Sequence, residues 1–176
     1  MMNLVNLTED VRAKMLDEIN ADIAANKLYE CPRLNTNGKA IFSSLLIQAA
    51  QSENDEWLAE ALQDQDCFNH TETRRTKNGP IVARVPVNAN EVLAEGEFNR
   101  YYVRALCLVA LERGVSSLVV YRARESSNPR SISIQMIGTS IEPRALLDDL
   151  RINIGVDTAL KLPPGPNSGL SVKLPQ

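Results

Sequence analysis

Residues 90–114, NEVLAEGEFNRYYVRALCLVALERG, decide the fold of this 176-residue chain. Apolar side chains recur in this stretch at helical spacing, and after Tyr101 they nearly encircle the helix axis. Gly114 is a typical residue at a helix end. A helix that is apolar on almost every side needs other elements around it, so we predict a long helix over residues 90–113 in the middle of the core.

Three shorter helices are predicted before this central helix. Thr8 precedes two acidic residues, a pattern that indicates an N-cap and a helix over residues 9–26. The Asn-Gly dipeptide at 37–38 predicts a turn. Apolar spacing then predicts two short helices, one over residues 40–51 and one that begins at residue 54 or 55.

Three strands are predicted from alternating or continuous apolar residues. They cover residues 80–87, 116–123 and 132–136, all rich in valine or isoleucine. The Ser-Asn-Pro turn at 127–129 separates the last two strands, which predicts a hairpin. The proline at position 86 favours an edge or end position for the first strand.

The predicted order of elements is typical of an α+β fold. A helical N-terminal part, residues 1–70, precedes a core over residues 71–159, in which a small sheet packs on the central helix. This core ends in a short helix with a cap at 139–140 and Pro143 in its first turn. Residues 160–176 form a third part.

The C-terminal arm, residues 160–176 (LKLPPGPNSGLSVKLPQ), combines proline and glycine with a series of leucines and a valine. Pro-Pro-Gly-Pro excludes a helix, so the arm is predicted to be extended. Leucines in an extended segment favour docking on another surface. We therefore predict that Leu170, Val172 and Leu174 bind a partner.

Composition limits the class of protein. The formal net charge of −3 gives no overall attraction to nucleic acid, and 44% hydrophobic residues are typical of a folded globular chain. No apolar run is long enough to span a bilayer, and the N-terminus has no signal-peptide pattern. We expect a protein that is made in the cytoplasm, does not enter a membrane and keeps its three cysteines as thiols.

Cys67 and His70 form the one Cys-x-x-His pair, and Cys31 is a third candidate zinc ligand. A closed zinc site needs four ligands, so we favour buried structural thiols and a loop histidine over a metal site. A cysteine nucleophile with His70 as its base is less favoured still, because no third orienting group is evident. No cofactor is predicted.

Two groups of cations remain as candidate contacts with a polyanion or a partner. Arg74, Arg75 and Lys77 lie in a polar stretch before the first predicted strand, and three further arginines flank the predicted turn at 127–129. A solvated loop, or a loop that pairs with an acidic neighbouring subunit, is favoured over nucleic-acid binding because no aromatic residues are interleaved to stack bases.

Glu97, Arg100 and Arg104 lie three and four residues apart on the central helix. This spacing predicts an ion pair on a solvated helix surface, worth about 0.3–0.5 kcal/mol, rather than an active site.

Seven blocks of the sequence are distinctive. They are CPRLN (31–35), ETRRTKNG (72–79), GEFNRYYVRALCLVALERG (96–114), VVYRARESSNPR (119–130), IGTSIEP (137–143), LLDDLR (146–151) and GVDTALKLPPGPNSGLSVKLP (155–175). These blocks resemble a small family of uncharacterised proteins from tailed-bacteriophage and prophage genomes. The resemblance implies a virion structural protein of the head or neck that works as a symmetric oligomer, and it implies no cofactor or catalytic residue.

The residues and the resemblance together favour a non-enzymatic structural protein of a tailed-phage virion, either a head-to-tail connector or a capsid-bound cement protein. Its expected partners are further copies of the chain and other virion proteins such as portal, capsid or tail components. The alternative is a nucleic-acid-associated accessory protein that uses residues 74–77. An enzyme built around Cys67 and His70 is the third and least favoured hypothesis.

Overall fold

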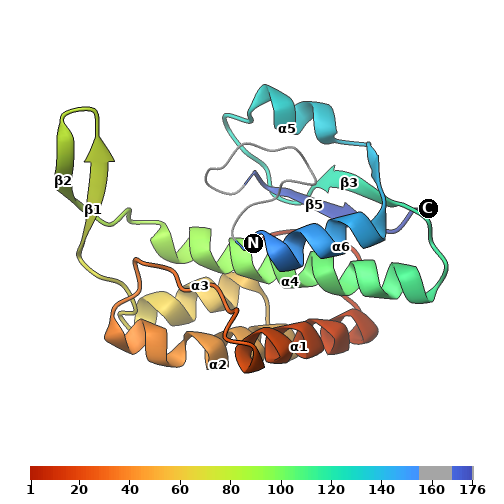
Figure 1. The fold of residues 1–176 in the computed structure, drawn as a ribbon, viewed down its shortest axis with the longest axis horizontal. Helices are drawn as coiled ribbons and strands as arrows, with labels where there is room; N and C mark the ends of the chain where they lie inside the picture. The colour runs from red at the N-terminus through yellow and green to blue at the C-terminus, as the bar shows by residue number, and fades with distance from the viewer. Residues whose placement is uncertain (155–167, 176) are drawn as a thin grey trace.

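The computed structural model describes residues 1–154 and 168–175, and these form an α+β fold (Figure 1). Helices α1 to α3 form a layer below α4, a small sheet lies above α4, and α6 packs against α4. In chain order the elements are α1 (Glu9–Ala24), α2 (Thr36–Ser52), α3 (Asp55–Asp64), β1 (Thr71–Thr76), β2 (Gly79–Arg84), α4 (Ala89–Glu112), β3 (Leu118–Arg122), α5 (Ser131–Met136), β4 (Ser140–Ile141), α6 (Pro143–Ile152) and β5 (Leu170–Lys173).

Helix α4 is the centre of the molecule, as its sequence predicts. It packs against α1, α3 and α6, and most of its side chains are buried. Phe98, Tyr102 and Leu106 are fully enclosed. One continuous hydrophobic core extends from Val11 of α1 through α4 to Val172 of β5. Because elements from both ends of the chain share this core, α4 determines where all of them sit.

The layer of α1 to α3 contains the three helices that the sequence predicts, but not every helix begins where predicted. Asn54 caps α3 by accepting a hydrogen bond from the Trp57 N–H at 2.9 Å. Helix α2 begins at Thr36 with Asn35 as its cap, four residues earlier than predicted. The predicted turn at 37–38 is therefore wrong. Gly38 lies inside the helix. This position requires glycine because a Cβ would collide with the carbonyl oxygen of Cys67.

The main sheet has three antiparallel strands in the order β4-β3-β5. Residues from distant parts of the chain meet in it, since Val120 of β3 pairs with Val172 of β5 and Leu118 pairs with Ile141 of β4. The outer edge of β5 is not open, because Asn99 and Tyr102 of α4 donate side-chain hydrogen bonds to its carbonyl oxygens at 2.9 and 3.4 Å.

Residues 131–136 form the short helix α5, so the predicted third strand and the hairpin after residue 127 are wrong. Ser133 donates its hydroxyl to the Arg130 carbonyl at 2.7 Å and is buried, which favours the helical turn. The partner of β3 on this side is the two-residue β4 instead. Helix α6 follows with Pro143 in its first turn, as predicted, but its cap is Glu142 and not residue 139 or 140.

The second sheet is the antiparallel hairpin of β1 and β2, and it stands away from the rest of the molecule beyond the N-terminal end of α4 (Figure 1). Strand β2 confirms the predicted strand near residue 80, although it ends at Arg84. Strand β1 was not predicted. None of the helices in the part of the chain that the structure describes is long and apolar enough to cross a membrane.

Candidate functional site: the projecting hairpin

Residues 71–84 form a hairpin because threonine, isoleucine and valine favour strands and a short polar link joins the strands. Thr76 pairs with Gly79 across the end, which leaves Lys77 and Asn78 at the tip. The Thr76 hydroxyl donates to the Gly79 carbonyl at 2.7 Å and accepts from the Asn78 N–H at 3.2 Å. Gly79 has φ of +111°, a conformation that favours glycine, so the turn is specified by the sequence Thr-Lys-Asn-Gly.

The base of the hairpin is fixed to the helical layer. The Asn69 N–H donates to the Arg33 carbonyl at 2.9 Å, and the Val85 N–H donates to the His70 carbonyl at 3.1 Å. Glu72 forms an ion pair with Arg33 at 2.6 Å. These contacts hold both ends of the hairpin together at its base, although the hairpin contributes no residue to the core.

The two faces of the hairpin differ in environment. Residues paired across an antiparallel ladder lie on the same face, so Glu72 shares one face with Ala83, and both are partly buried. The opposite face consists entirely of exposed side chains. Its members are Thr71, Thr73, Arg75, Pro80, Val82 and Arg84. We call this the outer face, and its central residue Val82 is 74% exposed.

The structure brings the three predicted cations Arg74, Arg75 and Lys77 together on this hairpin. Arg74 and Arg75 lie in β1 and not in a loop, whereas Lys77 lies in the turn at the tip. Arg74 forms an ion pair with Glu72 at 2.6 Å. Arg75 and Lys77 form no ion pair with any residue that the structure describes, and the same holds for Arg84 of β2. Arg84 could not be assigned to this group from the sequence, because it lies ten residues from Arg74 and only the strand pairing brings the two close together.

The predicted partner-binding residues of the C-terminal arm lie elsewhere. Leu170 and Val172 are buried in the core of their own chain as part of β5, and Leu174 packs against that core. The prediction that they bind a partner is therefore corrected: the apolar residues complete the sheet. Residues 160 and 162 and the Pro-Pro-Gly-Pro segment lie outside the described residues.

The zinc candidates are not arranged as a metal site. Cys31 and Cys67 are both buried, and burial raises the pKa of each thiol, which disfavours the thiolate that binds metal or attacks a substrate. His70 is exposed at the base of the hairpin. Within residues 1–154 and 168–175, no three histidine, cysteine, aspartate or glutamate side chains are grouped so that they would hold a metal ion.

The charged triplet of α4 is buried, so its prediction as a solvated surface is wrong. Arg104 forms ion pairs with Glu18 and Asp22 of α1, each at 2.5 Å, and Tyr101 donates to Asp22 at 2.9 Å. Arg151 of α6 also pairs with Glu18. This network joins α1, α4 and α6 through the core. The residues that bond to each other in this network lie at least 79 positions apart in sequence, which is why spacing within α4 did not reveal the pairs.

Glu97 lies in the same region without a hydrogen-bond partner for its Oε2 atom among the described residues. Burial raises the pKa of Glu97 to about 7, although Arg100 and Arg104 favour the charged form. The carboxyl group also acts electrostatically on Tyr29 and Cys31 in the segment between α1 and α2.

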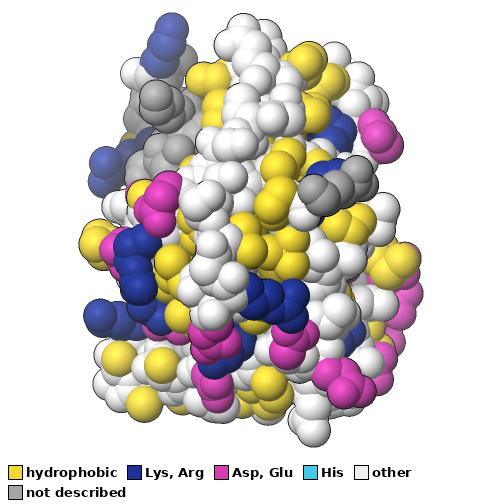
Figure 2. Space-filling view, turned by 90° about the vertical axis from the view of Figure 1, so that its right-hand side faces the viewer, with side chains coloured by type: hydrophobic (Ala, Val, Ile, Leu, Met, Phe, Trp, Pro, Cys, Tyr) yellow, Lys and Arg dark blue, Asp and Glu magenta, His cyan; other side chains and the backbone are white. Residues whose placement is uncertain are grey.

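Charge is distributed unevenly over the molecule. Residues 71–84 contain four basic and one acidic residue, which gives +3, whereas residues 1–70 contain five basic and twelve acidic residues, which gives −7. Figure 2 views the end of the molecule opposite the hairpin and shows most of its acidic side chains in the lower half, over the layer of α1 to α3. The cationic hairpin thus projects from an acidic helical layer.

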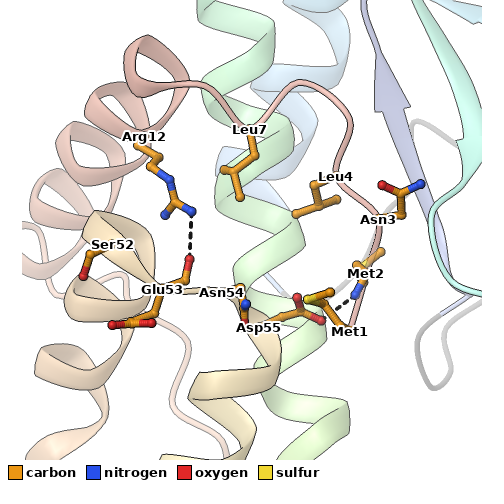
Figure 3. Close-up of a pocket in the computed structure, with 10 residues that line it drawn as sticks. All are labelled: Met1, Met2, Asn3, Leu4, Leu7, Arg12, Ser52, Glu53, Asn54 and Asp55. Atoms are coloured by element: carbon orange, nitrogen blue, oxygen red, sulfur yellow. Dashed lines mark hydrogen bonds between the residues drawn. The ribbon is translucent and has the colours of Figure 1, made fainter.

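A pocket of about 420 Å³ lies between the N-terminal segment and the turn from α2 to α3 (Figure 3). Arg12 and Asp55 in its lining are already engaged. Arg12 donates to the carbonyl oxygens of Ala50 and Glu53 at 2.8 Å each, and Asp55 accepts from the Met2 N–H at 2.8 Å. These bonds satisfy the C-terminal end of α2 and attach the N-terminal segment, so the pocket is a junction between elements.

No family model, curated protein or solved structure matches the chain.

Proposed function

We propose that this chain is a non-enzymatic structural subunit of a tailed-phage virion, a head-to-tail connector or a capsid-bound cement protein, and that the hairpin of β1 and β2 is its main contact with neighbouring subunits. The observation that carries the proposal is the hairpin itself. Fourteen residues form an ordered element outside the core, with Ile81 and Val82 exposed and three cations unpaired within the described residues. An element with these properties gains burial and charge partners only from another molecule.

The rigid attachment of the hairpin also suits it to assembly. The hairpin is fixed at its base by backbone hydrogen bonds and by the ion pair between Arg33 and Glu72, so little conformational freedom is lost when it docks. Both strands have open backbone edges along which another strand can pair. Portal, capsid or tail proteins and further copies of the chain are the partners that the resemblance implies.

A nucleic-acid-associated accessory protein remains the alternative, and the observation that favours it is the same set of unpaired cations, Arg75, Lys77 and Arg84. Three phosphate contacts give weak binding that falls steeply with salt. The outer face presents Val82 and Pro80 between these cations and no aromatic ring for stacking a base. A protein surface fits this combination better than a phosphate backbone.

The experiment removes the hairpin without disturbing the core. Because the Val85 N–H bonds to the His70 carbonyl, the two ends of the hairpin are adjacent, and residues 71–84 can be replaced by Gly-Gly. We expect the shortened chain to fold with a melting temperature close to that of the full chain. In cells that produce virions, the full chain should be found in purified particles in a fixed copy number, and the shortened chain should be absent from them.

The control variant is Arg144→Glu, which changes an exposed cation of α6 and should leave incorporation unchanged. Particles that never contain the full chain would refute the virion function. Equal incorporation of the shortened chain would refute the role of the hairpin. A gel-shift assay with duplex and single-stranded DNA at 50 and 200 mM salt tests the alternative, which is supported by hairpin-dependent binding that is lost at the higher salt.

A further inference from the structure

The outer face of the hairpin has a fixed spacing of charge. Arg84 lies opposite Thr71, and Arg75 lies four residues further along β1. At about 3.3 Å per residue, the two guanidinium-bearing positions are separated by about 13 Å, with Val82 between them. Lys77 extends the positive charge to the tip.

Helix α3 has an acidic face with matching dimensions. Glu56, Glu60 and Asp64 lie four residues apart, so they share one side of the helix, and all three are exposed. The distance from position 56 to position 64 is about 12 Å along the helix axis at 1.5 Å per residue. Helix α3 contains no basic residue, and these three acids form no ion pair with any residue that the structure describes.

We infer that the outer face of the hairpin docks on the acidic face of α3 in a second copy of this chain. The inference rests on the proposed function and names its partner. Arg84 and Arg75 are separated by almost the same length as Glu56 and Asp64, and Lys77 adds a third cation, also unpaired within the described residues, beyond them. The exposed Val82 would lie near the partly exposed Trp57, which flanks the acids. The acids of α3 are exposed within their own chain, so its own hairpin does not cover them.

The contact joins two different surfaces, so every copy offers one hairpin and one acidic face and can make two contacts at once. One hairpin face is smaller than the area that a stable interface needs, so a single contact is weak. Two contacts per subunit in a closed assembly raise the overall affinity without any new residue. Charged rims also make the association sensitive to salt.

The test measures the mass of the purified, nuclease-treated full chain by sedimentation over a range of protein and salt concentrations. The hairpin variant carries Arg75→Glu, Lys77→Glu and Arg84→Glu, and the α3 variant carries Glu56→Lys, Glu60→Lys and Asp64→Lys. We expect the unchanged chain to self-associate and each variant to associate at least about tenfold more weakly, because like charges then face each other. A chain with all six changes should associate again.

The matched control is a chain with Lys27→Glu, Lys39→Glu and Arg144→Glu, which has the same net charge as the hairpin variant and changes only exposed cations outside the hairpin. It should associate like the unchanged chain. Neutral alanine replacements at Arg75, Lys77 and Arg84 provide a second variant if the glutamates disturb the hairpin.

Three results would overturn the inference: an unchanged chain that remains a single chain at high concentration and low salt, association that the hairpin variant retains, or no recovery in the chain with six changes. A single chain that still enters particles through its hairpin would refute the self-contact and leave the virion function standing. Absence of the full chain from particles would refute the virion function, whatever the sedimentation result.

Discussion

Arg104 is enclosed in the core, and two carboxylates of α1 neutralise its charge. Burial of an arginine is costly unless ion pairs and hydrogen bonds replace its hydration, and Glu18, Asp22 and the aromatic ring of Tyr101 provide that replacement here. Spacing along α4 predicts that Glu97, Arg100 and Arg104 lie on one side of the helix. It does not predict burial, because the partners of Arg104 lie on another helix.

Glu97 leads to a prediction about pH. Its folded-state pKa is raised from 4.5 to about 7 by burial, so the folded chain keeps this proton at a pH where the unfolded chain loses it. The stabilising effect is complete below about pH 4.5 and is lost as the pH rises through 7. Because Glu97→Gln stays uncharged, the variant should be more stable than the original chain above pH 7, by about 3 kcal/mol at most.

The measurement is the free energy of unfolding in urea between pH 4.5 and 8, with the difference between variant and original chain plotted against pH. The charged groups that face Glu97 are Asp22 of α1 and Arg100 and Arg104 of α4, and they are present in both chains, so their own titration largely cancels. Glu91→Gln, at an exposed position of the same helix, is the control and should give a flat difference. If the difference in free energy of unfolding for Glu97→Gln is also independent of pH, this would contradict the claim that the Glu97 carboxyl is buried and uncharged.

The sequence correctly predicts the helices with strong apolar periodicity, but it does not predict the short elements. Helix α4 and helix α3 follow from apolar spacing and capping. Residues 131–136 alternate between polar and apolar residues, but a six-residue stretch fits either a strand or a helical turn, and the bonds around Ser133 favour the helix. Strand β1 has no buried face, so apolar alternation cannot reveal it.

Gly38 provides a test of packing between elements. Alanine normally stabilises a helix interior by up to about 1 kcal/mol relative to glycine. At this position its Cβ would overlap the Cys67 carbonyl oxygen and crowd the Leu34 side chain, so we expect Gly38→Ala to destabilise the chain by about 1–3 kcal/mol. Thermal unfolding measures the effect, with Lys39→Ala at the exposed neighbouring position as the control. A melting temperature at or above that of the original chain would show that α2 does not approach Cys67 so closely.

At the scale of the whole molecule, the two ends of the chain meet around α4. The Asn3 N–H bonds to the Ala123 carbonyl at 2.8 Å, and the Leu174 N–H bonds to the Asn6 side chain at 3.0 Å. The order of the predicted helices and strands predicts the α+β class, and the prolines and glycines of residues 160–176 predict an extended C-terminal segment. The sequence does not predict which surface that segment joins, because a series of leucines in extended conformation fits a neighbour and the chain's own sheet equally well.

Strand β5 should therefore be required for folding. Removal of residues 170–176 deletes Leu170 and Val172 from the core and leaves β3 without one of its partners, so we expect loss of the cooperative thermal transition. Removal of residues 175–176 alone is the control and should leave the transition in place, because Pro175 is exposed. A cooperative transition in the longer truncation, at the temperature of the full chain, would mean that β5 is not part of the fold.

The central claim is that the hairpin is the surface through which this chain binds its neighbours, and amide hydrogen exchange tests it most directly. Exchange of the free chain is compared with exchange of the same chain in purified particles. In the free chain the outward amides of residues 71–84 should exchange fast, because the hairpin is exposed and two-stranded. We predict strong protection of these amides in the particle. Unchanged fast exchange of the hairpin, with new protection confined to other exposed segments such as α5, would contradict the account.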